Sequence, residues 1–128
     1  MARLTAELNH HQLAYVPGEP IEGLAGWELD GPPKWVEARL YWHTAGKGDE
    51  DVVVVDTVRY DDPPAVDAQP FRFTAPQGPF SYAGRLLEIA WGVEVVAHRV
   101  KGTAHVDLTL SATGHPIRPP KPTSEATG

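Results

Sequence analysis

The chain has 128 residues, a hydrophobic fraction of 41%, a net charge of −6 and no cysteine. This length and composition suit one globular domain that folds without a disulfide or a metal ion. The acidic balance argues against a nucleic-acid partner, and the absence of cysteine excludes thiolate nucleophiles and cysteine-based metal sites. The first residues lack the apolar stretch of a signal peptide and no run has the length of a membrane span, so we expect a cytoplasmic protein without membrane insertion.

Short runs of alternating apolar residues, separated by Pro and Gly, predict β-strands along most of the chain. Seven or eight strands with one buried side each indicate an all-β, two-sheet antiparallel β-sandwich of the immunoglobulin-like kind over residues 1–113. The last segment, residues 114–128, contains four prolines and almost no apolar mass, which predicts a flexible tail. The expected strands lie at residues 4–8, 13–15, 21–29, 34–43, 51–60, 71–73, 85–100 and 103–112.

Two neighbouring strands carry candidate interaction residues. Trp35 and Tyr41 share the outer face of the strand at residues 34–43, and exposed Trp and Tyr are enriched in binding surfaces. The alternative is that loops or chain ends cover these two rings. The following strand contains four consecutive valines, among them Val52 and Val54, so both of its faces are apolar. At a sheet edge such a strand needs cover from a partner protein or from a second copy of the chain.

The last two strands predict a hairpin with a two-residue turn at Lys101-Gly102. This turn would pair Val95 with Leu108 and would place His98 opposite His105. The two imidazoles would then be close enough to share a divalent ion. A structural zinc site needs four ligands and only this pair can be nominated, so we expect a solvent-facing polar pair, no metal and no cofactor.

Two stretches contain motifs that are more specific than the apolar alternation of a β-sandwich. The first, at residues 15–23, reads Tyr-Val-Pro-Gly-Glu-Pro-Ile-Glu-Gly, and the second covers residues 71–76 and continues at 79–84 and 89–95. Pro17 presets φ for a turn and Gly18 can supply the positive φ that follows. Together these stretches resemble the arrestin-like clan, which includes the α-arrestins, the Vps26-type retromer subunits and the bacterial SpoOM-type β-sandwich proteins.

The resemblance implies an arrestin N-domain-like sandwich that scaffolds other proteins without enzymatic activity. Members of the clan typically carry two such sandwiches, and this chain has room for a single one, so their interdomain contacts cannot be carried over. Tyr82, in the second stretch, is expected to bury its ring and to tie down a loop with its hydroxyl.

Catalytic chemistry finds little support in the sequence. None of the three serines, Ser81, Ser111 and Ser124, lies in a Gly-x-Ser-x-Gly turn, and no Gly-rich loop opens a helix. We therefore expect a protein-interaction or scaffold module, a subunit of a larger bacterial assembly, and not an enzyme. The alternative is a small-ligand or carbohydrate-binding sandwich in which Trp35 and Tyr41 stack on a sugar. The sequence does not identify the partner, the pathway or the oligomeric state.

Overall fold

A computed structural model describes residues 2–46, 50–83 and 87–112. Within them the chain forms strands and one 3₁₀ turn, which confirms the all-β prediction, and no helix in this part is long and apolar enough to cross a membrane. The tail predicted at residues 114–128 lies outside the described residues. The elements are β1 (Arg3–Leu8), η1 (Asn9–His11), β2 (Ala14–Tyr15), β3 (Pro20–Glu28), β4 (Trp35–Gly46), β5 (Glu50–Asp61), β6 (Val66–Thr74), β7 (Tyr82–Ala83), β8 (Leu87–Ala97) and β9 (Ala104–Leu110).

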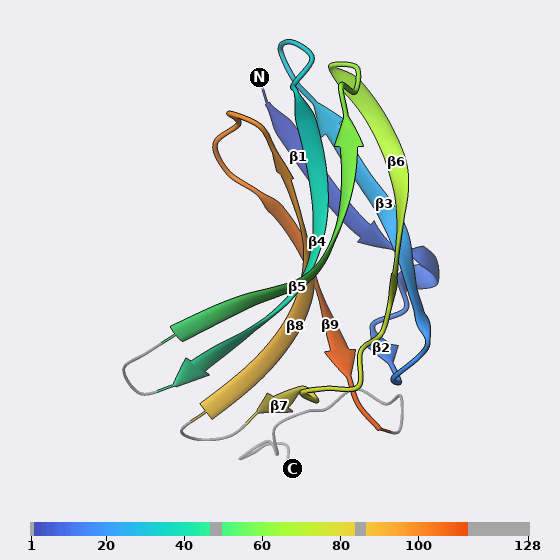
Figure 1. The fold of residues 1–128 in the computed structure, drawn as a ribbon, viewed down its shortest axis with the longest axis vertical. Helices are drawn as coiled ribbons and strands as arrows, with labels where there is room; N and C mark the ends of the chain where they lie inside the picture. The colour runs from blue at the N-terminus through green and yellow to red at the C-terminus, as the bar shows by residue number, and fades with distance from the viewer. Residues whose placement is uncertain (1, 47–49, 84–86, 113–128) are drawn as a thin grey trace.

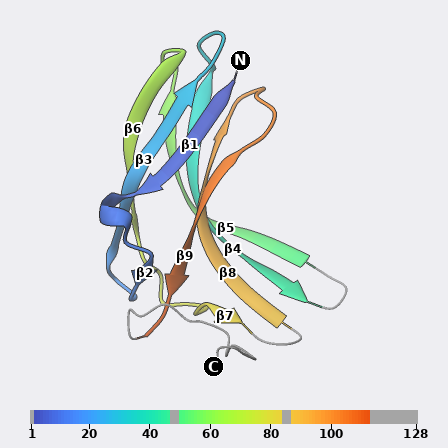
Figure 2. The ribbon, with the colours of Figure 1, turned by 180° about the vertical axis from the view of Figure 1, so that it is seen from behind.

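The strands form two sheets. One has the order β1-β3-β6, and the other has the order β2-β9-β8-β4-β5, with β7 paired to β8. All pairs are antiparallel except the two-residue pair of β2 with β9, which is parallel. The expected two-sheet antiparallel β-sandwich is confirmed. Figures 1 and 2 show the two sheets facing each other in the upper half of the molecule, while the ends of β4, β5 and β8 project away from the three-stranded sheet.

The core lies where the two sheets face each other. Alternate side chains of β3, β4 and β8 point inward and exclude water, which is the expected result of the period-two apolar pattern. The indole nitrogens of the two buried tryptophans are satisfied, since Trp27 donates to Pro64 O at 2.9 Å and Trp91 to Pro79 O at 2.7 Å. The buried set includes Ile21, Ala25, Trp27, Phe71 and Phe73 from the smaller sheet and Val36, Ala38, Leu40, Val93 and Val95 from the larger one.

The Pro-Gly turn forms as the sequence predicts. Gly18 has φ of +88°, and its amide donates to Ala75 O at 2.8 Å. The Ala75 amide donates in return to Glu19 O at 2.8 Å. The Glu19 carboxylate then accepts from the Val16 amide and from the Gln12 side-chain amide, each at 3.1 Å. The turn therefore fixes the start of β3 against the segment that follows β6.

The register predicted for the last hairpin is wrong. Trp91, and not Val95, lies opposite Leu108, and Val95 lies opposite Ala104. The connection is longer than two residues and spans residues 98–103. The observed pairing differs from the predicted one by an even number of residues, so each side chain stays on its expected face. Apolar patterning alone therefore could not reveal the error.

The prediction for Tyr82 is also wrong, because 53% of this residue is exposed. Its neighbour Ser81 does the anchoring. The Ser81 amide donates to Leu110 O at 2.8 Å, and the Ser81 hydroxyl oxygen accepts from the Leu110 amide at 3.0 Å. These two bonds tie the segment before β7 to the end of β9.

Candidate interaction surface

β5 is the edge strand of the larger sheet. It pairs with β4 on one side, and no strand of the described residues pairs with it on the other. Val52, Val53, Val54 and Val55 have exposed fractions of 63, 38, 45 and 42%, although they are apolar. We call Glu50–Asp56 the free half of β5, because its side chains are exposed throughout.

A β-bulge at Val55 interrupts the ladder between β4 and β5, since Asp56 and Val54 pair with consecutive residues of β4. Beyond the bulge, Val54 pairs with Tyr41 and Val52 with His43. These two valines therefore extend the outer face of β4. Bulges twist an edge and hinder indiscriminate pairing with other strands.

Carboxylates flank the valines of the free half. Glu50 and Asp51 precede them and Asp56 follows, and residues 50–56 contain no Lys or Arg. All three acidic residues are exposed. The free half thus combines an apolar centre with two negative ends.

The rest of the strand, Thr57–Asp61, is the covered half of β5. Tyr60 packs against Trp27 with ring centroids 5.7 Å apart, and its hydroxyl donates to Pro70 O at 2.8 Å. Burial raises the pKa of Tyr60 to about 12. Val58 also packs against the core. The facing sheet therefore covers one side of this half.

The outer aromatic residues of β4 lie against neighbours. The Trp35 ring is half-buried, with the Arg59 guanidinium 4.9 Å and the His98 ring 5.5 Å from its centroid. The Tyr41 ring crosses β8 above Gly92, where an added Cβ would lie 2.7 Å from the tyrosine hydroxyl. Each ring therefore has one face in contact with neighbouring groups of the same sheet. The role of Trp35 and Tyr41 in binding stays a prediction.

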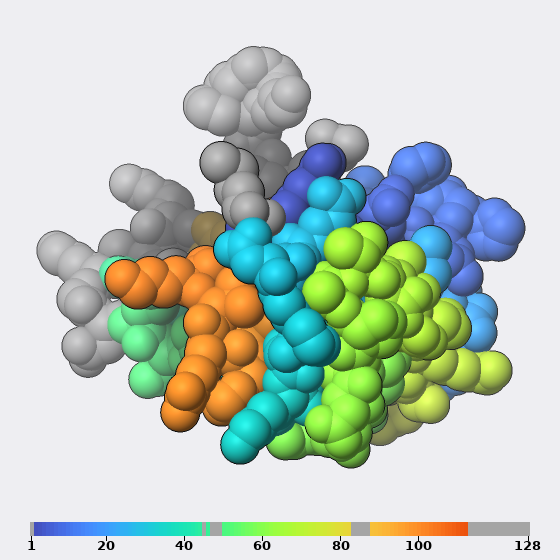
Figure 3. All heavy atoms as spheres, turned by 90° about the horizontal axis from the view of Figure 1, so that it is seen from above, coloured from blue at the N-terminus to red at the C-terminus, as the bar shows by residue number. Residues whose placement is uncertain are grey.

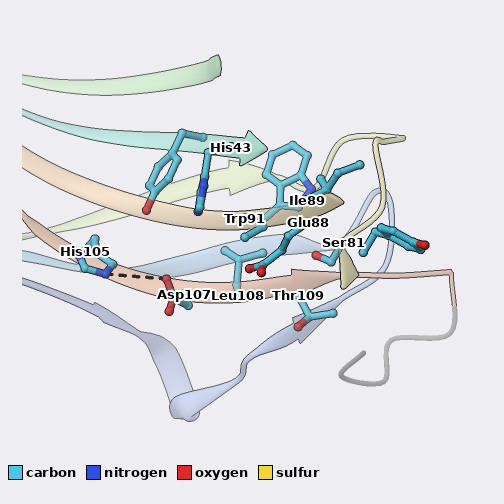
Figure 4. A pocket seen from close by; sticks show the side chains of 12 residues that line it. His43, Ser81, Glu88, Ile89, Trp91, His105, Asp107, Leu108 and Thr109 are labelled. Atoms are coloured by element: carbon cyan, nitrogen blue, oxygen red, sulfur yellow. Dashed lines mark ion pairs between the residues drawn. The ribbon is translucent and has the colours of Figure 1, made fainter. Parts of the chain in front are cut away.

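Tyr41 forms one wall of a groove on the outer face of the larger sheet, with a volume of about 550 Å³. His43 stacks beside Tyr41, with ring centroids 6.1 Å apart, and Asp107 and Thr109 of β9 line the opposite wall. Burial, and then the nearby carboxylates of Asp107 and Glu94, raise the pKa of Tyr41 above its usual value. Figure 4 shows the groove with the ring, carboxylate and hydroxyl groups that line it.

The histidines proposed as a metal pair are not brought together. His105 lies opposite Glu94 and its Nε2 is 3.9 Å from the Asp107 carboxylate, as the dashed line in Figure 4 marks. His98 lies in the β8–β9 connection, where its amide donates to Trp35 O at 3.0 Å. The longer connection explains the separation. No group of three or more His, Asp or Glu side chains in the described part of the chain could hold a metal ion.

Sequence reasoning found the valines but missed the groove. Its walls come from β4 and β9, and Glu88 of β8 and Ser81 complete one end. These residues lie far apart in the sequence and share no motif. They lie side by side because β8 pairs with both β4 and β9. A correct register for the β8–β9 hairpin would have placed them together, but the predicted register was wrong.

No protein-family model and no curated protein matches the chain. Among solved structures, the chain is similar to Spo0M, a sporulation control protein from Bacillus subtilis, with a TM-score of 0.60 and 18% sequence identity. The match covers 87% of this chain and 49% of that one, so the chain spans about half the length of the Spo0M structure. The likeness confirms the expected fold: the chain has a β-sandwich fold similar to that of the matched half of Spo0M.

Proposed function

We propose that the protein is a non-enzymatic interaction module that binds a partner protein along the free half of β5. One observation carries this proposal: four exposed valines lie on an edge strand whose outer side pairs with no other described strand. An edge strand offers backbone N–H and C=O groups to an added strand, and its side chains select which strand is added. Exposed apolar side chains at such an edge lose contact with water when a partner strand covers them.

The charges of the free half indicate what kind of strand it would accept. Pairing with a second copy would bring together six carboxylates, three from each copy, with no Lys or Arg in either segment. Like charges on neighbouring strands are destabilising, and each copy carries a net charge of −6. An extended segment with apolar residues between Lys or Arg residues is complementary instead. We therefore favour a basic-flanked strand of another protein over a homo-oligomer.

The fold is consistent with this role. Spo0M is a sporulation control protein, and control by binding requires no catalytic site. We infer no part in sporulation from a likeness of the fold alone. The role of the present chain rests on its own edge strand.

The test compares Val52→Asp with Val66→Asp. The two valines have the same exposed fraction, 63%, but Val66 begins β6 in the other sheet. Affinity capture with the wild-type chain identifies a partner, and titration calorimetry of the purified pair then measures binding to each variant. We expect Val52→Asp to weaken binding by about tenfold or more, since a carboxylate would be desolvated at the interface.

Val66→Asp should bind like the wild-type chain, and circular dichroism should show both variants folded. Equal binding by the wild-type chain and Val52→Asp would contradict the proposal. Light scattering provides the oligomeric state of the free chain. A dimer that Val52→Asp dissociates would show that a second copy, and not another protein, covers β5.

The outer groove supports a second candidate function, the binding of a small ligand or carbohydrate. The stacked rings of Tyr41 and His43, the Asp107 carboxylate and the Thr109 hydroxyl provide an aromatic face with hydrogen-bonding groups beside it. A thermal-shift screen against glycans and metabolites tests this candidate, since a ligand that binds only the folded state raises the melting temperature. A hit that Tyr41→Ala abolishes would favour the groove over β5.

A further inference from the structure

The Lys and Arg side chains of the described residues fall into two groups. The paired group forms ion pairs with carboxylates on the strands and comprises Arg39, Arg59 and Arg72. The second group has no ion pair within the described residues and comprises Arg3, Lys34, Arg99 and Lys101. All four lie at one end of the molecule, where β1 begins and where the β3–β4 and β8–β9 connections meet. Glu28, Asp30, Asp61 and Asp62 lie at the same end, so the excess of cations belongs to the lining of one pocket, where Lys34, Arg99 and Lys101 face a single carboxylate, Asp30.

These two connections line an open pocket of about 520 Å³. Figure 3 shows this end from above, with the β3–β4 segment in cyan running beside the β8–β9 segment in orange. Apolar groups and cations share the lining, and Asp30 is the single acidic residue among them. We define the cationic pocket by Leu29, Pro32, Lys34, Val100, Arg99 and Lys101.

Backbone bonds hold the two walls of the cationic pocket in place. The His98 amide donates to Trp35 O at 3.0 Å, which ties the β8–β9 connection to the start of β4. The Val100 amide donates to Ala97 O at 3.1 Å and closes a turn within that connection. The other wall is anchored where Lys34 O accepts from the Asp62 amide at 2.9 Å. A pre-formed site loses less conformational entropy on binding than a mobile one.

The composition of the lining selects the ligand. Leu29 and Val100 are only partly covered by the core and present apolar surface, whereas Lys34, Arg99 and Lys101 are exposed. A ligand with one apolar group between negative groups satisfies both parts of the lining. An anionic membrane would require the cations on a flat or protruding surface, and here they surround a concavity. An acidic peptide fits the concavity better.

We infer that the cationic pocket binds an extended acidic segment of a protein partner. An apolar side chain of that segment occupies the space over Leu29 and Val100. Its Asp or Glu side chains pair with Lys34, Arg99 and Lys101, and these charged hydrogen bonds are stronger than neutral ones. This site is independent of β5, since the cationic pocket and the free half lie at opposite ends of the larger sheet (Figure 1).

Fluorescence polarisation with a labelled pentapeptide tests the inference. The probe has a central Leu with Asp or Glu on both sides, and the comparison peptides replace the Leu by Ser or every acid by its amide. We expect Lys34→Glu combined with Lys101→Glu to raise the Kd for the probe by about tenfold or more, since charged hydrogen bonds are lost. Both comparison peptides should bind more weakly than the probe, and added salt should weaken probe binding.

Arg72→Glu is the matched control. It makes the same change of charge as Lys34→Glu alone, which is measured beside it, but on β6, where Arg72 is exposed and forms one long ion pair, of 3.6 Å, with Glu22. This variant should bind the probe like the wild-type chain. Thermal unfolding should be unchanged in Lys34→Glu with Lys101→Glu, whose residues are exposed, and slightly lowered in Arg72→Glu, which places like charges opposite each other at Glu22. An equal loss of binding in Arg72→Glu would overturn the inference, since the acidic probe would then respond to the overall charge of the protein and not to the cationic pocket.

Two further outcomes would also overturn it. Binding to phosphatidylserine vesicles that depends on Lys34 and Lys101, without binding of the probe, would show that the occupant is a lipid surface. Assembly of the free chain that Lys34→Glu with Lys101→Glu abolishes would show that the occupant is a second copy.

Discussion

The two halves of β5 belong to one strand and pair with the same neighbour, β4, but they differ in what lies across from them. The covered half faces the three-stranded sheet, and there even Tyr60, with its polar hydroxyl, is packed against Trp27 and Pro70. The free half contains four valines, and all of them remain exposed. The facing layer therefore decides burial along this strand, whereas the hydrophobicity of its own residues does not. Apolar residues that no facing sheet covers are available for contact with a partner protein.

The largest expected effect on stability lies in the covered half. Tyr60→Ala removes the contact with Trp27 and the hydrogen bond to Pro70, so we expect a loss of about 2 to 3 kcal/mol in the free energy of unfolding. Val54→Ala, in the free half, should change stability by less than about 0.5 kcal/mol. Denaturant unfolding measures both. Similar losses in the two variants would contradict the contrast between the halves.

A smaller effect should appear at alkaline pH. Burial raises the pKa of Tyr60 to about 12 from its ordinary value of 10.0. A raised pKa in the folded state means that the stabilisation is fully present below pH 10 and is lost as the pH rises toward 12. Unfolding measured across this interval should show falling stability, with a shallower fall in Tyr60→Phe. An identical slope in this variant would show that Tyr60 is not the titrating group.

The Arg59 side chain joins the covered half to β4 by an ion pair and by a stacked aromatic ring. It lies 3.1 Å from Glu37 and 2.9 Å from Asp61, and it stacks on Trp35. Because the side chain is about half exposed, Arg59→Gln should cost only about 0.5 to 1 kcal/mol, and less at high salt. Asp56→Asn, in the free half, serves as the control and should not lower stability. If the loss of stability in Arg59→Gln did not depend on salt, the effect would come from packing and not from the ion pairs.

The smallest effect on stability is expected for Val52→Thr. Threonine keeps the β-branch that suits a strand and adds a hydroxyl to an exposed position, so unfolding should change by less than about 0.5 kcal/mol. Partner binding should weaken nonetheless, because the apolar surface at the edge decreases. A large loss of stability would show that Val52 is buried in the free protein.

The sequence predicts those parts of the fold that depend on local chemistry. Alternation identified the buried faces of β3, β4 and β8, and the Pro-Gly pair marked a turn in which Gly18 has positive φ. It also placed valines on both faces of β5. Each of these features is written in neighbouring residues, so one stretch of sequence suffices to predict it.

Long-range features were predicted less well. The β8–β9 register was wrong because an even slip preserves the apolar pattern, and this error made His98 and His105 seem adjacent. The parallel pair of β2 with β9 has no sequence signal, since β2 contains two residues. The cationic pocket escaped notice for the same reason, because Lys34 and Arg99 meet only through the pairing of β4 with β8.

Hydrogen exchange of the β5 amides, with and without the captured partner, tests the central claim most directly. We expect the partner to slow exchange at residues 50–56 while residues 57–61 change little, and we expect Val52→Asp to abolish the difference. Unchanged exchange at residues 50–56 in a complex that is demonstrably formed would contradict the account, because the partner would then bind elsewhere on the sandwich.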